Sequence, residues 1–230
     1  KKFCNLDKHR FDIKQEVIAK SGLFVTKKRY GLKIINDNGK KVDKMMVKGL
    51  DTVRSSFPIA MKEMLSKLLD DIMMDVPKDK LDKFILNFKK SMKLMDFEKI
   101  AIPTGMKGLE KYKDNTDVLF TGYKLGTPVH VKSAIFHNDL LRYYKMDKRY
   151  EKIINNEKIK WVYLKQNEFN LSVIAFKGYD DAPQIIDFIK RHINTEKIYE
   201  QVLHKKIMML YEALGWDEPT DATKTIERFF

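Results

Sequence analysis

The sequence predicts an α+β fold in which a basic β-hairpin comes first and a mostly helical region with a small β-sheet follows. An Asn-Gly pair between two extended segments near the N-terminus predicts the hairpin. Apolar residues at helical spacing over much of the remainder predict the helices. The chain has 230 residues, of which 43% are hydrophobic, so it is long enough and apolar enough to fold around a packed core.

The hairpin is expected to pair residues 29–36 with residues 41–48 around Asn36-Asp37-Asn38-Gly39. Asn-Gly provides the positive φ angles that tight hairpin turns need. Apolar and polar residues alternate only imperfectly along the two segments, so the turn signal carries this prediction.

Two helices are expected next. Ser55-Ser56-Phe57-Pro58 predicts a helix start with a serine cap and a proline in the first turn. Asp75-Val76-Pro77 is expected to end this helix and to begin another. Apolar residues at helical spacing mark the face that each helix buries, and we interpret these stripes as core: Leu65, Leu68, Leu69, Ile72, Phe84, Ile85, Phe88 and Met92.

The middle of the chain, residues 100–127, is interrupted by one proline and four glycines, which predicts short strands and loops. Beyond it the pattern predicts a helix at 128–144, strands at 159–165 and 171–176 with a turn near Asn167-Glu168, and helices at 183–192 and 195–214. The chain becomes polar after Gly215-Trp216.

Positive charge is concentrated at the N-terminal end. The net charge is +13, and residues 1–50 hold 14 Lys/Arg and 5 Asp/Glu, a net charge of +9. A concentrated basic excess indicates a polyanionic partner, most often nucleic acid. The alternative is that lysines simply decorate solvated faces.

Cysteine content and hydropathy limit the other classes of protein. Cys4 is the one cysteine, so the chain forms no internal disulfide and offers no cysteine-based metal site. No apolar run approaches the roughly 18 residues of a membrane span, and no signal peptide is visible. We therefore expect a cytoplasmic protein, in the host cytoplasm if it is viral, without a membrane partner. The start at Lys1-Lys2-Phe3, without methionine, suggests a processed or trimmed N-terminus.

The segment Lys27-Lys28-Arg29-Tyr30 is expected to open a strand. Alternation would then place Lys28 and Tyr30 on one face, and Lys27 and Arg29 on the other. A lysine beside an aromatic ring can bind phosphate and press the ring against a sugar or a base edge. The alternative is a solvated sheet edge.

This segment also carries a family resemblance. Lys27–Gly31 resembles the KKRYA (KxY) motif of family-B DNA polymerases, and Phe11–Ile18 lies where their last palm strand segment lies. Val47–Pro58 resembles their K-G-x-x-x-x-x-S-S-x-P stretch, which leads into the thumb. Lys111-Tyr112, Pro128–Lys132 and the closing helices are similar to later segments of the polymerases of T-even-like phages, which the chain most resembles.

The resemblance implies DNA-binding roles for several residues. Lys28 and Tyr30 would contact the minor groove of the primer-template near the primer end, with Lys27 and Arg29 as neighbouring support. Ser55 and Ser56 would meet phosphate at a helix N-terminus, where free N–H groups favour anions. Simple N-capping is the alternative role of these serines.

Three further places are candidates for contact with DNA or metal. The resemblance implies a DNA-backbone contact by Lys132, two residues after His130. Basic and aromatic residues at 142–150 could line a duplex groove, or could form the end of an amphipathic helix. Glu16 corresponds to a region near the family's metal site, but no partner carboxylate stands three residues away, so we interpret it as a surface charge.

The C-terminal tail resembles a sliding-clamp-binding motif, Q-x-x-[ILM]-x-x-[FY]-[FY]. Ile226, Phe229 and Phe230 supply its three apolar positions, whereas Thr223 stands in place of the glutamine. Exposed apolar residues on a tail favour a partner that buries them. Folding back onto the chain's own core is the alternative.

The family's catalytic motifs have no match in the sequence, so we expect no catalytic and no metal-binding residue here. Phosphoryl transfer to a primer requires two Mg²⁺ ions held by carboxylates, but Asp51-Thr52 is not followed by an aspartate. Asp70-Asp71 and Asp180-Asp181 are expected to be cap and surface charges, because adjacent helical residues diverge. A DNA-directed DNA polymerase activity would therefore need an N-terminal polymerase portion that holds the Mg²⁺.

The resemblance divides the chain into three parts: the end of the palm at 1–54, the thumb at 55–216, and a clamp-binding tail at 217–230. The chain would then be either a fragment or the natural C-terminal subunit of a split polymerase, with primer-template DNA, a sliding clamp and an N-terminal portion as partners. A stand-alone accessory protein that binds duplex DNA or the clamp without catalysis is the rival hypothesis.

Overall fold

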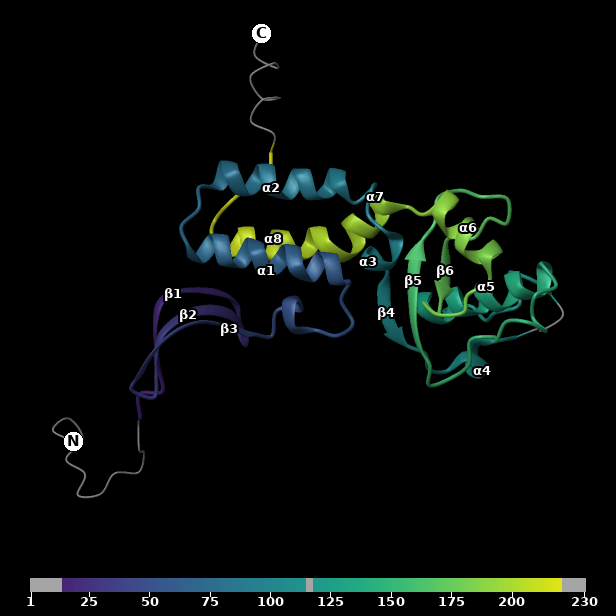
Figure 1. Ribbon diagram of the computed structural model, residues 1–230, viewed down its shortest axis with the longest axis horizontal. Helices are drawn as coiled ribbons and strands as arrows, with labels where there is room; N and C mark the ends of the chain where they lie inside the picture. The colour runs from purple at the N-terminus through teal and green to yellow at the C-terminus, as the bar shows by residue number, and fades with distance from the viewer. Residues whose placement is uncertain (1–13, 115–117, 221–230) are drawn as a thin grey trace, which may run out of the picture.

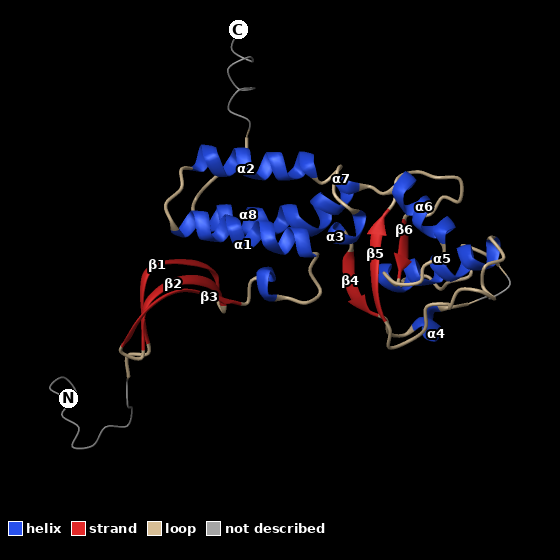
Figure 2. Ribbon diagram, viewed as in Figure 1, coloured by secondary structure: helices blue, strands red, loops and turns tan. Residues whose placement is uncertain are grey.

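A computed structural model describes residues 14–114 and 118–220 (Figure 1). It confirms the α+β prediction, since helices are combined with two antiparallel three-stranded sheets in the orders β1-β2-β3 and β4-β5-β6 (Figure 2). Within the described residues, no helix is long and apolar enough to cross a membrane.

The first sheet contains the predicted hairpin, formed by β2 (Arg29–Asp37) and β3 (Lys40–Lys48). Asn38 and Gly39 both have positive φ in the turn, as Asn-Gly predicted. A third strand, β1 (Val17–Thr26), pairs with β2 and was not predicted at this length. The hairpin is thus part of a larger antiparallel sheet.

Three long helical segments form the middle of the molecule. They are α1 (Ile59–Met73), α2 (Lys78–Ser91), and a C-terminal segment made of α7 (Thr195–Ile198), a π-helical turn (Tyr199–His204) and α8 (Lys205–Ala213). The predicted stripes are confirmed as core, because Leu68, Leu69 and Ile85 are almost completely buried and Phe84 and Phe88 pack against them. Pro77 precedes α2, as the sequence indicated.

The predicted serine cap of α1 is wrong. Pro58 occupies the N-cap position, and no side chain caps the helix. Ser55 and Ser56 lie in the exposed turn before it. Since proline presets the φ angle of a helix start, α1 begins without a hydroxyl cap.

The second sheet lies at the other end of the molecule (Figure 1). Its strands are β4 (Ile102–Gly105), β5 (Lys158–Tyr163) and β6 (Val173–Phe176). The helices of this region are α3 (Phe97–Ile100), α4 (Leu109–Tyr112), α5 (Val129–Tyr143) and α6 (Pro183–His192). Helix α5 packs along β6. The predicted helices and strands are confirmed here, with strands shorter than expected.

One face of the first sheet packs against α1 and α8. A Cβ at Gly31 would lie 3.1 Å from Cδ2 of Leu69 on α1, so the strand backbone approaches the helix closely. The Ser21 hydroxyl donates a hydrogen bond to the Met73 carbonyl at 3.2 Å. Leu23 and Leu50 belong to the same apolar core as the helices.

Candidate nucleic-acid interface

The basic motif lies at the tip of a hairpin. Lys27 and Lys28 form the turn between β1 and β2, so the prediction that these two residues open a strand is wrong; only Arg29 and Tyr30 are in the strand. Lys28 has a φ of 68°, in the left-handed region that tight hairpin turns use. Lys27 and Lys28 are exposed at this tip.

An aromatic pair and a lysine form one row across the three strands. Phe24 pairs with Tyr30, and Tyr30 pairs with Lys48. Directly opposite residues project from the same face of a sheet. Phe24 is 69% exposed, and its ring centroid lies 5.7 Å from that of Tyr30. We call Phe24, Tyr30 and Lys48 the strand row.

The neighbouring row establishes which way the strand row faces. Leu23, Gly31 and Val47 pair with one another on the opposite face. Gly31 approaches α1, and Leu23 is buried. The strand row therefore faces away from the helices and toward solvent.

Sequence reasoning missed Phe24 and Lys48 because it had no register. Counting back from the Asp37–Lys40 pair without interruption would place Tyr30 opposite Val47. A bulge between Ile34 and Asn36 shifts the pairing by one residue, which brings Lys48 opposite Tyr30. A shift of one residue exchanges the two faces of a strand. The bulge left no clear signal in the sequence.

Arg29 lies on the other side of the motif. Its Nη1 is 3.9 Å from the sulfur of Met209 on α8, and its side chain is half-buried. Sequence alternation placed Arg29 on the face opposite Tyr30, and this contact agrees with that placement. Arg29 thus joins the hairpin tip to a helix.

Ser55 and Ser56 are exposed, and neither acts as the expected N-cap of α1. Glu16 is also exposed, and its backbone carbonyl accepts a hydrogen bond from the Asn38 amide at 2.6 Å. Ile226, Phe229 and Phe230 lie outside the described residues, as does Cys4.

Lys132 is far from the hairpin, on α5 at the other end of the molecule (Figure 1). Its Nζ lies 4.5 Å from the ring centroid of Tyr123 and 5.5 Å from that of Phe136. Its charge is therefore held over aromatic rings. His130 is two residues earlier and points to a different side of the helix. Burial lowers the pKa of His130.

The basic and aromatic residues at 142–150 are partly used in packing. The Tyr143 ring lies 4.8 Å from Phe169 and 5.2 Å from Tyr144, measured between centroids. Arg142 pairs with the buried carboxylate of Asp139 at 3.8 Å. Tyr143 remains 51% exposed, so this end of α5 combines a packed cluster with an accessible ring.

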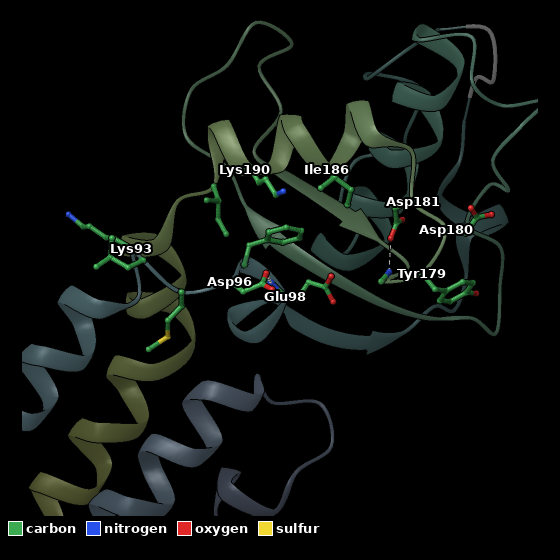
Figure 3. Close-up of a pocket in the computed structure, with 13 residues that line it drawn as sticks. Lys93, Asp96, Glu98, Tyr179, Asp180, Asp181, Ile186 and Lys190 are labelled. Carbon is green, nitrogen blue, oxygen red and sulfur yellow. Dashed lines mark hydrogen bonds between the residues drawn. The ribbon is translucent and has the colours of Figure 1, made fainter.

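A cleft of about 580 Å³ lies between the α2–α3 connection, the 178–181 loop and α6 (Figure 3). Its polar groups are largely paired within the chain. Asp181 accepts hydrogen bonds from the amides of Lys177 and Gly178, and Glu98 pairs with Lys160 at 3.0 Å. Its carboxylates make it a poor site for a polyanion.

The adjacent aspartates do not cap helices, because the N-caps of α1 and α6 are Pro58 and Ala182 and neither helix has a side-chain cap. Asp71 pairs with Lys67 at 2.6 Å, and Asp181 organises the loop before α6. Across residues 14–114 and 118–220, no group of three or more His, Cys, Asp or Glu side chains is arranged to hold a metal ion.

The model of DNA polymerase family B matches residues 4–214, which include both sheets and all the helices described above. No curated protein matches the sequence.

Proposed function

Since the chain belongs to DNA polymerase family B, we propose that it is the C-terminal portion of a replicative polymerase of the kind found in T-even-like phages. Residues 1–54 would end the palm, residues 55–216 would form the thumb, and residues 217–230 would bind a sliding clamp. Its task would be to hold primer-template duplex and to tether the enzyme.

The hairpin tip with the strand row is the observation that carries this proposal. Lys27 and Lys28 are exposed at the turn, and the rings of Phe24 and Tyr30 lie on the adjacent solvent face beside Lys48. Ammonium groups attract phosphate whatever the sequence, while aromatic rings contact sugars and base edges. The pairing suits the minor groove of a duplex near its primer end.

Lys132, Ser55 and Ser56 are proposed as weaker backbone contacts. The main role of Arg29 would be to fix the hairpin tip to α8 rather than to contact DNA, because its guanidinium approaches Met209. Contacts of this kind position a duplex and carry no sequence preference.

The chemical step would belong to another portion of the enzyme. Template-directed addition of a nucleotide needs two divalent ions that stabilise the attacking and leaving oxygens. We propose that an N-terminal portion, on the same chain or on a second subunit, holds Mg²⁺ in carboxylates. The residues of this chain would orient the primer end for that step.

Extension of a primed template tests the proposal. The chain is mixed with a family-B portion that carries the catalytic aspartates, and nucleotide incorporation is measured with and without it. We expect a large gain in extension when both are present. Equal extension with and without the chain, together with undiminished DNA binding by the chain alone, would favour the rival accessory-protein hypothesis.

The proposed clamp tail has a separate test. Deleting residues 226–230 should abolish binding to the cognate clamp and leave clamp-free extension unchanged, because tethering raises effective concentration without new contacts at the primer end. Clamp binding that survives the deletion would contradict the role of Ile226, Phe229 and Phe230.

A further inference from the structure

The loop that follows β3 presses directly against the hairpin tip. Gly49 has a φ of +66°, and a Cβ at this position would lie 2.3 Å from the carbonyl oxygen of Lys28. The same Cβ would lie 3.1 Å from Cγ of Arg29. Only glycine allows two backbone segments to approach this closely. The position of this loop therefore limits where Lys28 can lie.

A nearly buried carboxylate holds the loop. Asp51, two residues after Gly49, is 8% exposed and begins the 3-10 helix Asp51–Val53. Its Oδ2 lies 3.0 Å from Nζ of Lys206 on α8, and its Oδ1 lies 3.1 Å from Nη1 of Arg54. One carboxylate thus connects the loop both to the start of the helical region and to α8.

The same side of α8 also holds the tip itself. Lys206 and Met209 are three residues apart, so their side chains lie on neighbouring positions of one helical face. Lys206 binds Asp51, and Met209 contacts Arg29. Arg29, Asp51, Lys206 and Met209 also line one small cavity. Loop and tip are therefore fixed to a common support.

We propose that Asp51 is a positioning residue for Lys28, acting through the Asp51–Lys206 ion pair and the close contact of Gly49 with the Lys28 backbone. The proposal rests on the DNA-binding role proposed for the hairpin tip. Asp51 itself would not touch DNA. It would hold the loop against α8, so that the ammonium group of Lys28 is presented in one place.

The sign of the expected effect separates positioning from simple charge. Asp51→Asn removes a negative charge from a basic surface, and general electrostatics predicts that this tightens DNA binding. The variant also weakens the hold on Lys206 and Arg54, because a neutral amide attracts the two cations less than a carboxylate does. If Asp51 positions Lys28, the variant should weaken DNA binding in spite of both changes.

Binding of the 230-residue chain to a fluorescein-labelled primer-template duplex, followed by anisotropy, measures this sign. We expect Asp51→Asn to raise the dissociation constant roughly threefold to tenfold, which lies within the roughly twofold to thirtyfold range of effects transmitted through packed contacts. Asp71→Asn is the matched control, because it removes the same charge from an ion pair with Lys67 on α1. The control should bind as tightly as the parent chain or slightly more tightly.

A double-mutant cycle tests whether the effect passes through Lys28. Lys28→Ala combined with Asp51→Asn should bind no more weakly than Lys28→Ala alone, because the positioned group is already gone. Fully additive losses would overturn the inference.

Hydrogen exchange of backbone amides tests, in the absence of DNA, whether Asp51 restrains the loop and the hairpin tip. In Asp51→Asn, peptides covering residues 24–31 and 45–54 should exchange faster, whereas peptides covering 129–143 should not change. Unchanged exchange in the first two peptides would overturn the inference even if binding weakens. If Lys28→Ala leaves the dissociation constant unchanged, the proposed DNA role fails, and the exchange measurement still decides whether Asp51 positions the tip.

Discussion

The two three-stranded sheets differ in how much of their surface other elements cover. Every residue of β6 is buried, and Phe176 is 0% exposed, with its ring centroid 5.1 Å from that of Phe97. In the first sheet one face packs on helices, while the other carries Phe24 at 69% exposure. An aromatic residue in the second sheet serves the core. One on the open face of the first sheet is available to a partner.

The largest expected effect comes from exchanging aromatic for alanine in each sheet. Phe176→Ala should destabilise the protein by about 3–5 kcal/mol, because it removes a fully buried ring and leaves a cavity. Phe24→Ala should change stability by less than about 1 kcal/mol, since its ring is mostly exposed. Urea unfolding of both variants measures the contrast. A similar loss of unfolding free energy in the two variants would mean that the Phe24 ring is packed against other residues rather than exposed.

Acid should affect the region of the second sheet first. His137 on α5 is buried, and its Nδ1 donates to the Ala175 carbonyl at 2.9 Å. The pKa of His137 is lowered to about 4: burial lowers it most, the Ala175 hydrogen bond and Glu157 raise it, and Lys177 lowers it.

The folded-state pKa is lower than that of the unfolded chain, so the unfolded state binds more protons between these values. Protonation of His137 should therefore cost no unfolding free energy well above pH 6.5, and should lower the free energy of unfolding by about 2 kcal/mol at pH 5. Urea midpoints measured from pH 7 to pH 5 test this, with His137→Gln as the comparison. A parent protein whose midpoint falls no more steeply than that of His137→Gln would contradict it.

Smaller effects are expected on the open face, and they concern DNA rather than stability. Tyr30→Ala should weaken binding of primer-template by about 1 kcal/mol, because it removes a ring proposed to contact sugar or base edges. Lys28→Ala should weaken it for every sequence and should reduce the salt slope of the binding constant by about 1. Anisotropy titrations at several salt concentrations measure these changes.

The sequence predicted the helices and strands better than it predicted which side chains share a face of the first sheet. The Asn-Gly turn, the apolar stripe through Leu65 and Leu69, and the helix at 128–144 are local patterns, and the structure contains all of them. The serine cap failed because Ser55 and Ser56 compete with a proline that starts the helix without them. The local sequence alone does not show whether a serine cap or a proline start is the more favourable way to begin this helix.

The candidate site was predicted only in part, for a reason that is not local. The motif Lys27–Tyr30 was found from its residues, but Phe24 and Lys48 join it through strand pairing, and a bulge sets that pairing. Asp51 was noted only for the aspartate that does not follow it. Its pair with Arg54 is local, but its pair with Lys206 depends on how α8 lies against the loop, and these two residues are about 155 positions apart in sequence.

The π-helical turn at Tyr199–His204 changes which side of the C-terminal helical segment faces its neighbours. A π-helical turn carries one more residue than an α-helical turn, so the side chains that follow are rotated by about 100° relative to an uninterrupted α-helix. Before the turn, α7 contacts β5 in the second sheet; after it, α8 contacts β1 in the first. The extra residue therefore lets one helical segment present different sides to the two sheets.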